Sequence, residues 1–582
     1  MKRARAVVLG LLAAVLAGCT QVPLAQPAPE TAEPTAGPEP TELVVGMEDL
    51  GAGFNPHLLA HSSPLTTGIA TLVLPSVFRP DPDGRLQLDT TIATSAEVVS
   101  DEPFTVSYEL NLEASWSTNT PIAAEDFVYL WEQMRAEPGV ADAAGYRLIT
   151  EVRSRAGGKA VDVVFDEPYP AWRTLFSDLL PAHLLKDAPG SWVGALTGGV
   201  PASGGPFRIA SVDPGRGEVV LARNDTYWDT PTVLDTLVFR RLDDGAVAAG
   251  LAAGDVDVAL PEADPAVRNA LGTVTPPPRV QPAALPTVTQ LGLRAGDGPL
   301  RDPRARRGLA ALLDREGIRQ AVAPEALRAD AFGLAPSEPG YASTAPDGAP
   351  ARPDPIAAEQ LLGAAGWTRD AEGSWIADGQ PVQLVIAAAE ERPEDRRVGQ
   401  LVAAQLAVAG IGTTVVERPA IDLYTAPSAS GTAPTTSPEP TPTTPAPTTA
   451  VAAEEPVVAG PVDVLVGPRT VGGDRATELA SDYGCALPTA VVRDPPLPPT
   501  GFCFPALQLV LESLATGDDP VDPERFATAE SLLWSQLPAL PLFQPVSLVV
   551  SSPAADASTG IGAGPLTEGP LSGAAEWRAP AE

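Results

Sequence analysis

Histidine, cysteine and methionine are scarce in this chain of 582 residues, which contains three of each. His57 and His61 are four residues apart, a spacing that places two imidazoles on one face of a helix and suits a zinc site. However, Pro56 precedes the pair, no glutamate follows His57, and no third ligand is evident. The sequence therefore predicts no metal site and favours an ordinary loop for the two histidines.

Signatures of catalysis are missing as well. The sequence contains no G-x-S-x-G nucleophile elbow, no phosphate-binding P-loop and no convincing dinucleotide-binding fingerprint. Glu125 and Asp126 are adjacent carboxylates, but they fall in the first turn of a predicted helix, where the helix dipole stabilises negative charge. We predict a protein that is not an enzyme and that uses no cofactor.

Positive charge is low. The chain has 38 Lys and Arg residues against 73 Asp and Glu residues, which gives a formal net charge of −35. Such a chain repels phosphate backbones and anionic lipid surfaces, which argues against a nucleic-acid-binding role. No stretch after residue 19 is long and apolar enough to cross a membrane. The charge balance fits an exported protein, and an apolar fraction of 44% is ordinary for a folded chain.

The N-terminus carries a positive signal. Lys2, Arg3 and Arg5 precede an apolar core at residues 7–16, and the string L-A-G-C follows and ends at Cys19. The core has secretory length and is too short for a membrane span. The string resembles the bacterial lipobox, in which the cysteine thiol is lipidated and the peptide is cut just before it.

This resemblance divides the start of the chain. It implies a signal peptide at residues 1–18 and a lipid-bearing Cys19. Residues 19–41 are rich in Pro, Ala, Glu and Thr and cannot bury enough apolar surface to fold, so we expect a disordered tether. Because stable anchoring takes at least two acyl chains, the diacylglyceryl group implied by the lipobox predicts attachment to the outer face of the cell membrane.

Three later features are compositional. Cys485 and Cys503 are an isolated pair in an exported chain, which predicts a disulfide; metal binding is the alternative, although no histidine lies near them. The Pro/Thr/Ser tract at 426–455 predicts a disordered or O-glycosylated loop. The stretch after Ser551, rich in Gly, Ala, Ser and Pro, is expected to lie loosely over the surface.

Between these features, strand and helix patterns alternate. Alternating or β-branched residues predict strands, and apolar residues at helical spacing predict helices. Residues 302–322 form one amphipathic helix in this interpretation. The order strand, helix, strand over 381–418 suggests a parallel sheet. The predicted strands are 41–47, 104–112, 207–213, 218–224, 381–389 and 411–418, and the other predicted helices are 123–137, 355–367 and 395–410.

Taken in order, these segments resemble the family 5 extracellular solute-binding proteins, the oligopeptide- and dipeptide-binding class of ABC importers. The resemblance runs from about residue 42 to about residue 550. It implies an α/β fold of the type II periplasmic-binding-protein kind, with three lobes and a hinged ligand cleft. The segments that carry it are 107–134, 179–185, 203–228, 234–260, 300–318 and 357–367.

The resemblance also implies how the chain is divided. We expect two crossing strands to act as the hinge, with ligand trapped between lobes I and III. The glycine-rich stretch 198–205 would be a flexible crossover between lobes. The expected divisions are residues 42–85, 205–290 and 538–582 for lobe I, 86–204 for lobe II, and 291–537 for lobe III.

One motif of the family is recognisable although altered. The family pattern W-S-D-G-T-P-x-T-A-E-D corresponds here to residues 116–126, with Thr118 and Asn119 in place of Asp and Gly. Asparagine tolerates positive φ better than most residues, so the turn can survive. We interpret the motif as structural, with Glu125 and Asp126 at the start of a helix.

The ligand site is predicted from three segments that line the cleft in the family. These are residues 53–57, 467–474 and 543–547. Peptide-binding members carry a tryptophan and an acidic proline-containing stretch in the third lobe, and this chain has neither after Asp463. We expect Arg469 to face the cleft and bind phosphate or carboxylate, or else to be a solvent-facing loop arginine. The candidate ligand-binding residues are Asn55, Arg469, Asp474 and Gln544.

The resemblance implies a function and partners. We expect a monomeric, lipid-anchored binding protein of an ABC importer, working with a permease and ATPases. Its ligand would be a peptide-like or other solute, which means a small molecule, a peptide or a glycolipid. The divergent third lobe adds the hypothesis that an anionic or sugar-rich ligand is preferred over a peptide with a free amino terminus. The divergent third lobe, the Pro/Thr tract and the lipoprotein start also resemble an actinobacterial branch of the family. The alternative is therefore a non-transport regulator of cell-envelope glycolipid synthesis that kept the solute-binding fold.

Overall fold

The structure is a computed structural model. It describes most of the chain from residue 41 onward, in the ranges given at the end of this paragraph. Cys19 and the tract 426–455 lie outside that part, so the predictions made for them are not addressed by it. Within it, none of the helices has the length and apolar content needed to span a bilayer. The described residues are 41–296, 298–346, 352–425, 461–488, 491–493, 495–517, 522–555 and 561–579.

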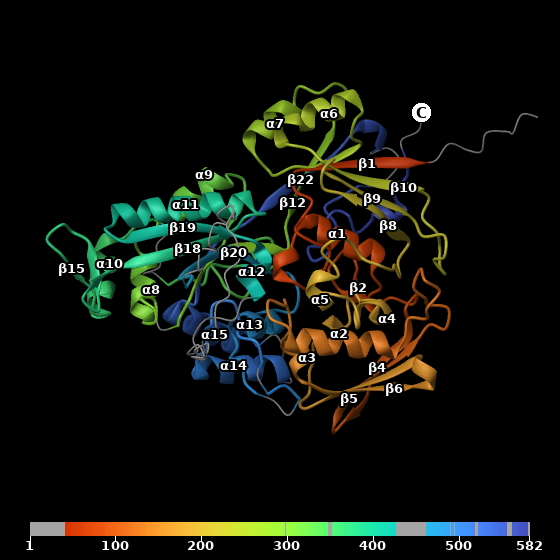
Figure 1. Ribbon diagram of the computed structural model, residues 1–582, viewed down its shortest axis with the longest axis horizontal. Helices are drawn as coiled ribbons and strands as arrows, with labels where there is room; N and C mark the ends of the chain where they lie inside the picture. The colour runs from red at the N-terminus through yellow and green to blue at the C-terminus, as the bar shows by residue number, and fades with distance from the viewer. Residues whose placement is uncertain are drawn as a thin grey trace, which may run out of the picture. The chain divides into compact units, whose positions relative to one another are not determined.

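A seven-stranded sheet forms the first lobe (Figure 1). Its central strand β1 (Glu42–Met47) pairs in parallel with β10 (Thr236–Arg241) and β11 (Val258–Leu260). The sheet therefore gathers segments from the beginning, the middle and the end of the chain. The remaining strands are β12 (Arg279–Ala284), β22 (Val546–Ser551), β9 (Glu218–Arg223) and β8 (Phe207–Asp213), and the order is β12-β22-β11-β1-β10-β9-β8.

Alternation along β1 decides which helices cover each face of this sheet. Successive strand residues point to opposite faces. Leu43 and Val45 are fully buried in the main core, which also contains residues of α1 (Pro64–Val73). Val44 packs against a separate cluster that includes α6 (Val247–Ala253) and α7 (Pro265–Leu271). Helices therefore lie on both sides of the sheet (Figure 1).

A four-stranded antiparallel sheet forms the second lobe. Its order is β4-β5-β7-β6, and α2 (Ala124–Ala136) packs against it. A hairpin of β2 (Phe78–Pro80) and β3 (Leu86–Leu88) leads from α1 into this sheet. The strands are β4 (Ala93–Asp101), β5 (Phe104–Leu110), β7 (Ala160–Phe165) and β6 (Ile149–Arg155), and the short helices are α3 (Ala144–Arg147), α4 (Ala182–Leu185) and α5 (Ser191–Gly194).

A six-stranded mixed sheet forms the third lobe, in the order β14-β21-β13-β20-β18-β19. Strands β18 (Gln383–Ala389) and β19 (Gly412–Arg418) are parallel and are joined by α11 (Pro393–Val408), which confirms the predicted strand–helix–strand unit. The other strands are β14 (Leu327–Arg328), β21 (Ala539–Gln544), β13 (Thr287–Leu293) and β20 (Val464–Thr470).

Helices and a small sheet complete the third lobe. The predicted single helix at 302–322 is wrong, because the chain forms two helices, α8 (Pro303–Ala310) and α9 (Arg315–Val322). Asp314 starts the second one, since its carboxylate accepts a hydrogen bond from the backbone N–H of Gly317 at 2.8 Å. The other elements are α10 (Pro355–Ala364), α12 (Ala420–Thr425), α13 (Arg475–Tyr483), α14 (Pro505–Thr516), α15 (Pro523–Gln536), β15 (Thr368–Arg369), β16 (Trp375–Ala377) and β17 (Gln380–Pro381).

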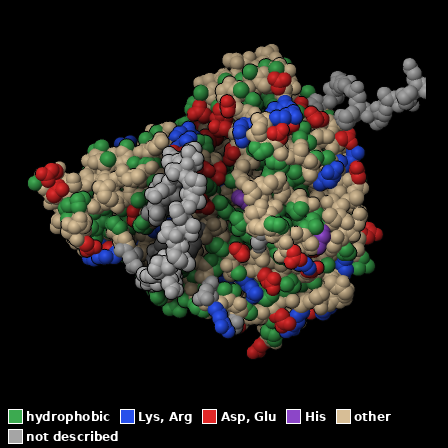
Figure 2. Space-filling model, viewed as in Figure 1, with side chains coloured by type: hydrophobic (Ala, Val, Ile, Leu, Met, Phe, Trp, Pro, Cys, Tyr) green, Lys and Arg blue, Asp and Glu red, His purple; other side chains and the backbone are tan. Residues whose placement is uncertain are grey.

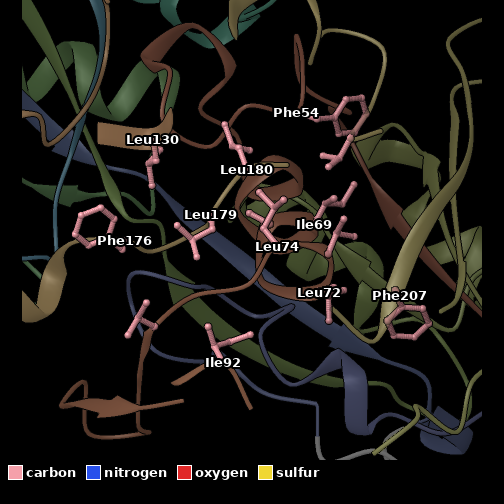
Figure 3. Close-up of a cluster of buried hydrophobic side chains, with 14 of the residues drawn as sticks. Phe54, Ile69, Leu72, Leu74, Ile92, Leu130, Phe176, Leu179, Leu180 and Phe207 are labelled. Carbon is pink, nitrogen blue, oxygen red and sulfur yellow. The ribbon is translucent and has the colours of Figure 1, made fainter. Parts of the chain in front are cut away.

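The first and second lobes share one hydrophobic core (Figure 3). Phe54, Ile69 and Phe207 from the first lobe belong to the same buried cluster as Leu130 and Phe176 from the second. The third lobe has a separate cluster. Burial of apolar surface is the dominant favourable term in folding, so lobes one and two form one packed unit and lobe three forms another.

Two stretches pack more tightly than their composition suggested. The segment after Ser551 does not lie loosely on the surface, because Leu571 and Trp577 are 1% and 2% exposed and belong to the shared core. Within 198–205, Gly205 is buried where a Cβ atom would collide with the backbone carbonyl of Leu72. Close approach of two backbones accounts for a glycine at that position better than flexibility does.

The chain passes between the first and third lobes at two adjacent points. One crossing joins β12 to β13, and the other joins β21 to β22. They are bonded to each other, because the Leu285 N–H donates to the Pro545 carbonyl at 2.9 Å. Gln544 strengthens the junction by donating from Nε2 to the Leu285 carbonyl, also at 2.9 Å. Two short adjacent connections of this kind suit a hinge.

Candidate functional site

A cavity of about 590 Å³ lies where the three lobes meet. Its wall includes residues of α1, of the β2–β3 hairpin and of the second-lobe loop 170–178. The third lobe contributes Thr470 to Asp474, at the end of β20 and the start of α13, and Pro286 and Thr287 line it at the crossing point. This volume falls in the range of about 300–1,000 Å³ that is typical of small-molecule sites.

The third-lobe part of the wall is a tight turn. Gly472 has φ of 98°, a conformation that side-chain-bearing residues rarely adopt, and Asp474 then caps α13 by accepting from the Thr477 N–H at 2.9 Å. Gly472 also lies against the C-terminal segment, because a Cβ there would approach Leu566 Cδ2 at 2.9 Å. The C-terminal segment thus reaches from the first lobe to the third beside the cavity.

Hydroxyl and carboxyl groups dominate the polar part of the wall. Arg173 is the single arginine or lysine that lines the cavity among the described residues. The lining carboxyl groups are those of Asp142, Asp178, Asp474, Glu478 and Glu568, and the hydroxyl groups include those of Ser62, Thr67, Ser177, Thr287, Thr470 and Thr567.

Burial makes several of these carboxyl groups hard to ionise. Desolvation raises the pKa of Asp142 to about 7, with the nearby carboxylate of Asp482 adding to the effect. Desolvation also raises the pKa of Glu568 to about 7, although Arg79 opposes the shift. The Oδ1 atom of Asp142 is buried and accepts no hydrogen bond within the described part of the chain. A ligand hydroxyl donated to Asp142 would satisfy that oxygen.

His57 and His61 are held by separate partners. His57 lines the cavity, its ring stacks on Trp192 at 5.5 Å between centroids, and its Nε2 lies 3.0 Å from the Asp178 carbonyl oxygen. His61 Nδ1 accepts from the backbone N–H of Asn55 at 3.2 Å, and burial lowers the pKa of His61 to about 4. Burial likewise lowers the pKa of His57, so both rings are neutral at pH 7.

Arg469 does not occupy either of the positions expected for it. It lies in strand β20, is 2% exposed, and does not line the large cavity. Its guanidinium group pairs with Asp482 at 2.7 Å and with Glu478 at 3.3 Å, and both carboxylates come from α13 of the same lobe. A guanidinium fork can hold both carboxyl groups at once.

The other three candidates are dispersed. Asp474 lines the cavity, whereas Asn55 is fully buried beside it, with its Oδ1 accepting from the His57 N–H at 3.1 Å. Gln544 is fully buried at the crossing and bonds to Ser337 as well as to Leu285. Of the three predicted segments, 53–57 and 467–474 contribute residues to the wall and 543–547 contributes none.

Asp142 and Glu568 are site residues that the sequence analysis did not select. Asp142 follows α2 in the chain, in a backbone conformation with φ of 52°, and Glu568 lies in the C-terminal segment. Glu568 Oε1 is 3.7 Å from Arg79 Nη1. Neither residue belongs to a sequence motif. Both reach the cavity wall through packing between segments that are far apart in the chain.

Two further sequence predictions have clear outcomes. Cys485 and Cys503 form a disulfide in the third lobe, as predicted. Asn119 has φ of 63°, so the altered turn does retain its left-handed residue, and Asp126 then accepts from the Ala123 N–H at 3.0 Å at the start of α2. Trp116 Nε1 donates to the same carboxylate at 3.2 Å. The motif at 116–126 is therefore structural.

Direct contacts join the third lobe to the other two around the cavity. Tyr169 Oη and Thr477 Oγ1 are 2.6 Å apart, and the Ala144 N–H donates to Ser481 Oγ at 3.1 Å. Arg392, next to α11, donates to the Leu59 carbonyl at 2.8 Å. These contacts hold the third lobe against the other two beside the cavity.

Comparisons with known proteins agree with this geometry. Residues 87–451 match the sequence profile of the bacterial extracellular solute-binding proteins, family 5 middle region. The chain is 34% identical to LpqW of Mycobacterium tuberculosis, a probable monoacyl phosphatidylinositol tetramannoside-binding protein, over 98% of this chain and 96% of that one. It is 29% identical to the oligopeptide-binding protein OppA of Mycobacterium bovis, over 42% and 45% of the two chains.

Solved structures share the fold at low sequence identity. The oligopeptide-binding protein AppA of Bacillus subtilis, in complex with a nonapeptide, aligns with a TM-score of 0.70 at 15% identity, over 93% of this chain and 99% of that one. The periplasmic EDTA-binding protein EppA aligns with a TM-score of 0.69 at 21% identity, over 93% and 97%. At these identities the similarity establishes the fold alone.

Proposed function

Because this chain belongs to the bacterial extracellular solute-binding proteins of family 5, we propose that it captures a polyhydroxylated solute between its lobes and delivers it to an ABC importer. Membership of the family makes the chain a binding protein rather than an enzyme. The permease and ATPase subunits are proposed partners, since family members work with such importers.

One observation carries the proposal, namely a cavity between two separately packed units beside their hinge, with carboxyl and hydroxyl groups in its wall. Pro286 and Thr287 line the cavity and follow directly on the Leu285–Pro545 contact. A solute that touches both units stabilises the closed arrangement by its differential contacts there. In this proposal, the two packed units move as rigid bodies about the Leu285–Pro545 contact.

The chemistry of the wall favours sugar-like ligands. A carboxyl group with a pKa near 7, as in Asp142 and Glu568, exchanges hydrogen bonds with hydroxyl groups without leaving a buried charge unpaired. Within the described part of the chain, Arg173 is the one lining cation that an anionic ligand finds, because Arg469 is already paired. Of the two ligand classes expected from the sequence, the sugar-rich one is therefore the one proposed.

A second candidate function rests on the near full-length similarity to LpqW. That relative is named for a mannose-bearing glycolipid, and the similarity to OppA spans less than half of this chain. In this alternative, the cavity holds the head group of a glycolipid and the protein regulates cell-envelope glycolipid synthesis without transport. Loss of solute uptake in a deletion strain supports the importer, and altered envelope glycolipids with unchanged uptake support the regulator.

The ligand class can be tested directly. Native mass spectrometry of protein purified from its own host should reveal a bound polyhydroxylated solute. Calorimetry with short mannosides and short peptides should give heat only with the mannosides. Asp142→Asn should weaken mannoside binding about tenfold, the cost of one buried hydrogen bond to a carboxyl group. The exposed Asp187→Asn serves as the control, and tight peptide binding that survives Asp142→Asn would end the proposal.

Membrane anchoring through Cys19 is a separate proposal, supported by the L-A-G-C string and by the extracellular family. Cys19→Ala should remove lipidation and shift the protein from the detergent phase to the aqueous phase in phase separation. A Cys19→Ala protein that still partitions with detergent would contradict the anchor.

A further inference from the structure

The short helix α12 of the third lobe packs against the first lobe beside the cavity. Leu423 and Tyr424 of α12 belong to a buried apolar cluster, to which the first lobe contributes residues of the helical turn η1 (Leu59–His61). Those residues are Leu59 and Ala60, and all four are at most 6% exposed. Figure 1 shows α12 on the side of the third lobe that faces the first two. The remaining members of the cluster come from the third lobe and are Ala387, Ala389, Ala420, Val462 and Leu465.

Each side of this contact is fixed to its own packed unit. The Leu59 N–H donates to the Gly139 carbonyl of the second lobe at 3.0 Å, so η1 stays with the first two lobes. The Ala420 N–H at the start of α12 donates to Glu391 Oε2 at 2.9 Å, so α12 stays with the third lobe. Because neither element belongs to the crossing strands, a rotation of the third lobe about the hinge separates α12 from η1.

Arg392 of the third lobe holds the same turn through its backbone. Its Nη2 donates to the carbonyl oxygens of Leu59 at 2.8 Å and of Ser62 at 2.9 Å. Leu59 and Ser62 also line the large cavity. The turn that the third lobe grips is therefore the turn that a bound solute meets, which connects lobe contact to the contents of the cavity.

An ion pair elsewhere along this junction is weaker. Figure 2 shows acidic side chains gathered near the junction between the region of α6 and α7 and that of α11. There Arg397 of α11 pairs with Glu262 of the first lobe, with Nη2 and Oε2 3.6 Å apart. Both side chains are more than 40% exposed, and exposed ion pairs contribute little. The buried apolar surface at η1 is therefore the larger contribution to contact between the lobes.

Tyr424 contributes its ring to this contact rather than its hydroxyl group. The Oη atom is buried and has no hydrogen-bond partner within the described residues. It lies against Gly467 of β20, where a Cβ atom would collide with it. A buried hydroxyl group without a partner opposes burial, so packing of the ring is what holds Tyr424 in place.

We propose that Leu423, Tyr424 and Arg392 form a latch that holds η1 and keeps the third lobe in contact with the first two when no solute is bound. This inference rests on the proposed capture of a solute by lobe closure. The three are positioning residues, because they act on the cavity through η1. A solute that binds the closed arrangement finds it already populated, so the latch raises the apparent affinity. The latch must also release before a solute enters or leaves.

The test measures the distance between the two packed units without solute. Nitroxide labels are placed at Val233→Cys in the first lobe and Val408→Cys in the third, which are 51% and 92% exposed. The full chain carries Cys19→Ala, so that the native cysteines offer no free thiol. Double electron–electron resonance should give one short distance for this parent protein. Leu423→Ala and Tyr424→Ala should each lower the ratio of closed to open protein about tenfold or more, the effect of one buried apolar side chain, and together they should add a clear longer distance.

Two controls separate the latch from general loss of packing. Leu511→Ala is the matched control, because Leu511 is fully buried in the separate core of the third lobe. It should lower the melting temperature and leave the distance unchanged. Tyr424→Phe should keep the short distance, since only the unpaired hydroxyl group is lost. The proposal is overturned if the parent is open without solute, if the double variant keeps the parent's distance, or if Tyr424→Phe opens the lobes as far as Tyr424→Ala does.

Calorimetry with short mannosides connects the latch to the cavity. Leu423→Ala should weaken mannoside binding by the factor by which it lowers the closed population, and Leu511→Ala should leave binding unchanged. Equal mannoside affinity for the parent and for variants that open would overturn the connection. If none of the proteins binds a mannoside, the proposed ligand class fails, and the distance measurement still decides whether the latch exists.

Discussion

The first two lobes and the third lobe differ in how their interiors are built. Lobes one and two bury their side chains in one continuous cluster, so that Phe207 and Phe176 belong to the same core. The third lobe encloses its own core and adds a disulfide and a buried arginine with two carboxylate partners. The two units meet through polar contacts and through a small apolar cluster, which includes Leu59 of the first lobe and Leu423 of the third. The molecule therefore has two separately packed bodies, and its cavity lies at the junction between them.

The largest effect should come from Trp577→Ala, which removes a ring from the shared core. Large-to-small core substitutions of this kind cost about 3–5 kcal/mol of unfolding free energy. Hydrogen exchange should show lost protection in both β10 and β5, with β18 and β20 unaffected. Trp534→Ala, which empties the third-lobe core instead, should give the reverse pattern. If Trp577→Ala deprotects β10 and leaves β5 intact, the first two lobes do not share a core.

Arg469→Ala should be nearly as damaging, and within the third lobe only. Removing one partner from a buried ion pair costs about 3–5 kcal/mol, because the other charges stay buried. Urea unfolding should show the loss, and exchange should rise in β20 and α13. Arg396→Ala, which breaks an exposed pair with Glu417, should cost only about 0–1 kcal/mol. A small effect of Arg469→Ala would show that the buried network contributes little to the third lobe.

Removing the disulfide tests whether the third lobe unfolds separately from the first two. Cys485→Ser with Cys503→Ser opens a loop with a sequence separation of 18, and the chain-entropy relation puts its contribution at about 3 kcal/mol. Calorimetry should show a lower transition temperature for the third lobe and an unchanged one for the first two. Equal shifts in both would mean that the lobes unfold together.

The smallest effect concerns pH and the cavity wall. The folded-state pKa of Glu568 is about 7, above the value of about 4.5 for a free glutamate. The folded protein therefore binds the proton more tightly, so stability is fully present below pH 4.5 and declines as pH rises through 7. Melting temperature should fall between about pH 4.5 and pH 7, and Glu568→Gln should reduce that slope. Glu576→Gln, an exposed carboxylate in the same segment, should leave the slope unchanged.

Local features of this fold could be predicted from the sequence because their causes are local. The apolar spacing in α2, the alternation in β1 and the turn at Asn119 each depend on neighbours a few residues away. The order of these segments resembles that of the family, and this resemblance predicted the three-lobed architecture. Asp314 marks the limit of this approach, since a single cap residue divides a helical pattern that looks continuous.

The residues of the candidate site were harder to predict from the sequence, because contacts between segments far apart in the chain bring them together. Arg79 and Glu568 meet across nearly the whole chain, and no sequence spacing reports such a contact. Arg469 did carry a usable signal, because Glu478 and Asp482 are four residues apart on the following helix and can face one strand residue together. The burial of Leu571 and Trp577 was hidden by the surrounding Gly, Ala and Pro residues, which show no periodic pattern.

The order in which the chain is synthesised has a consequence for folding. Strand β11 pairs with β22, and Trp577 completes the core of the first two lobes. That unit cannot finish folding until Trp577 has left the ribosome. The strands of the third lobe, from β13 to β21, come from one continuous stretch and can be complete earlier. The third lobe can therefore complete its sheet while the core of the first two lobes still lacks Trp577.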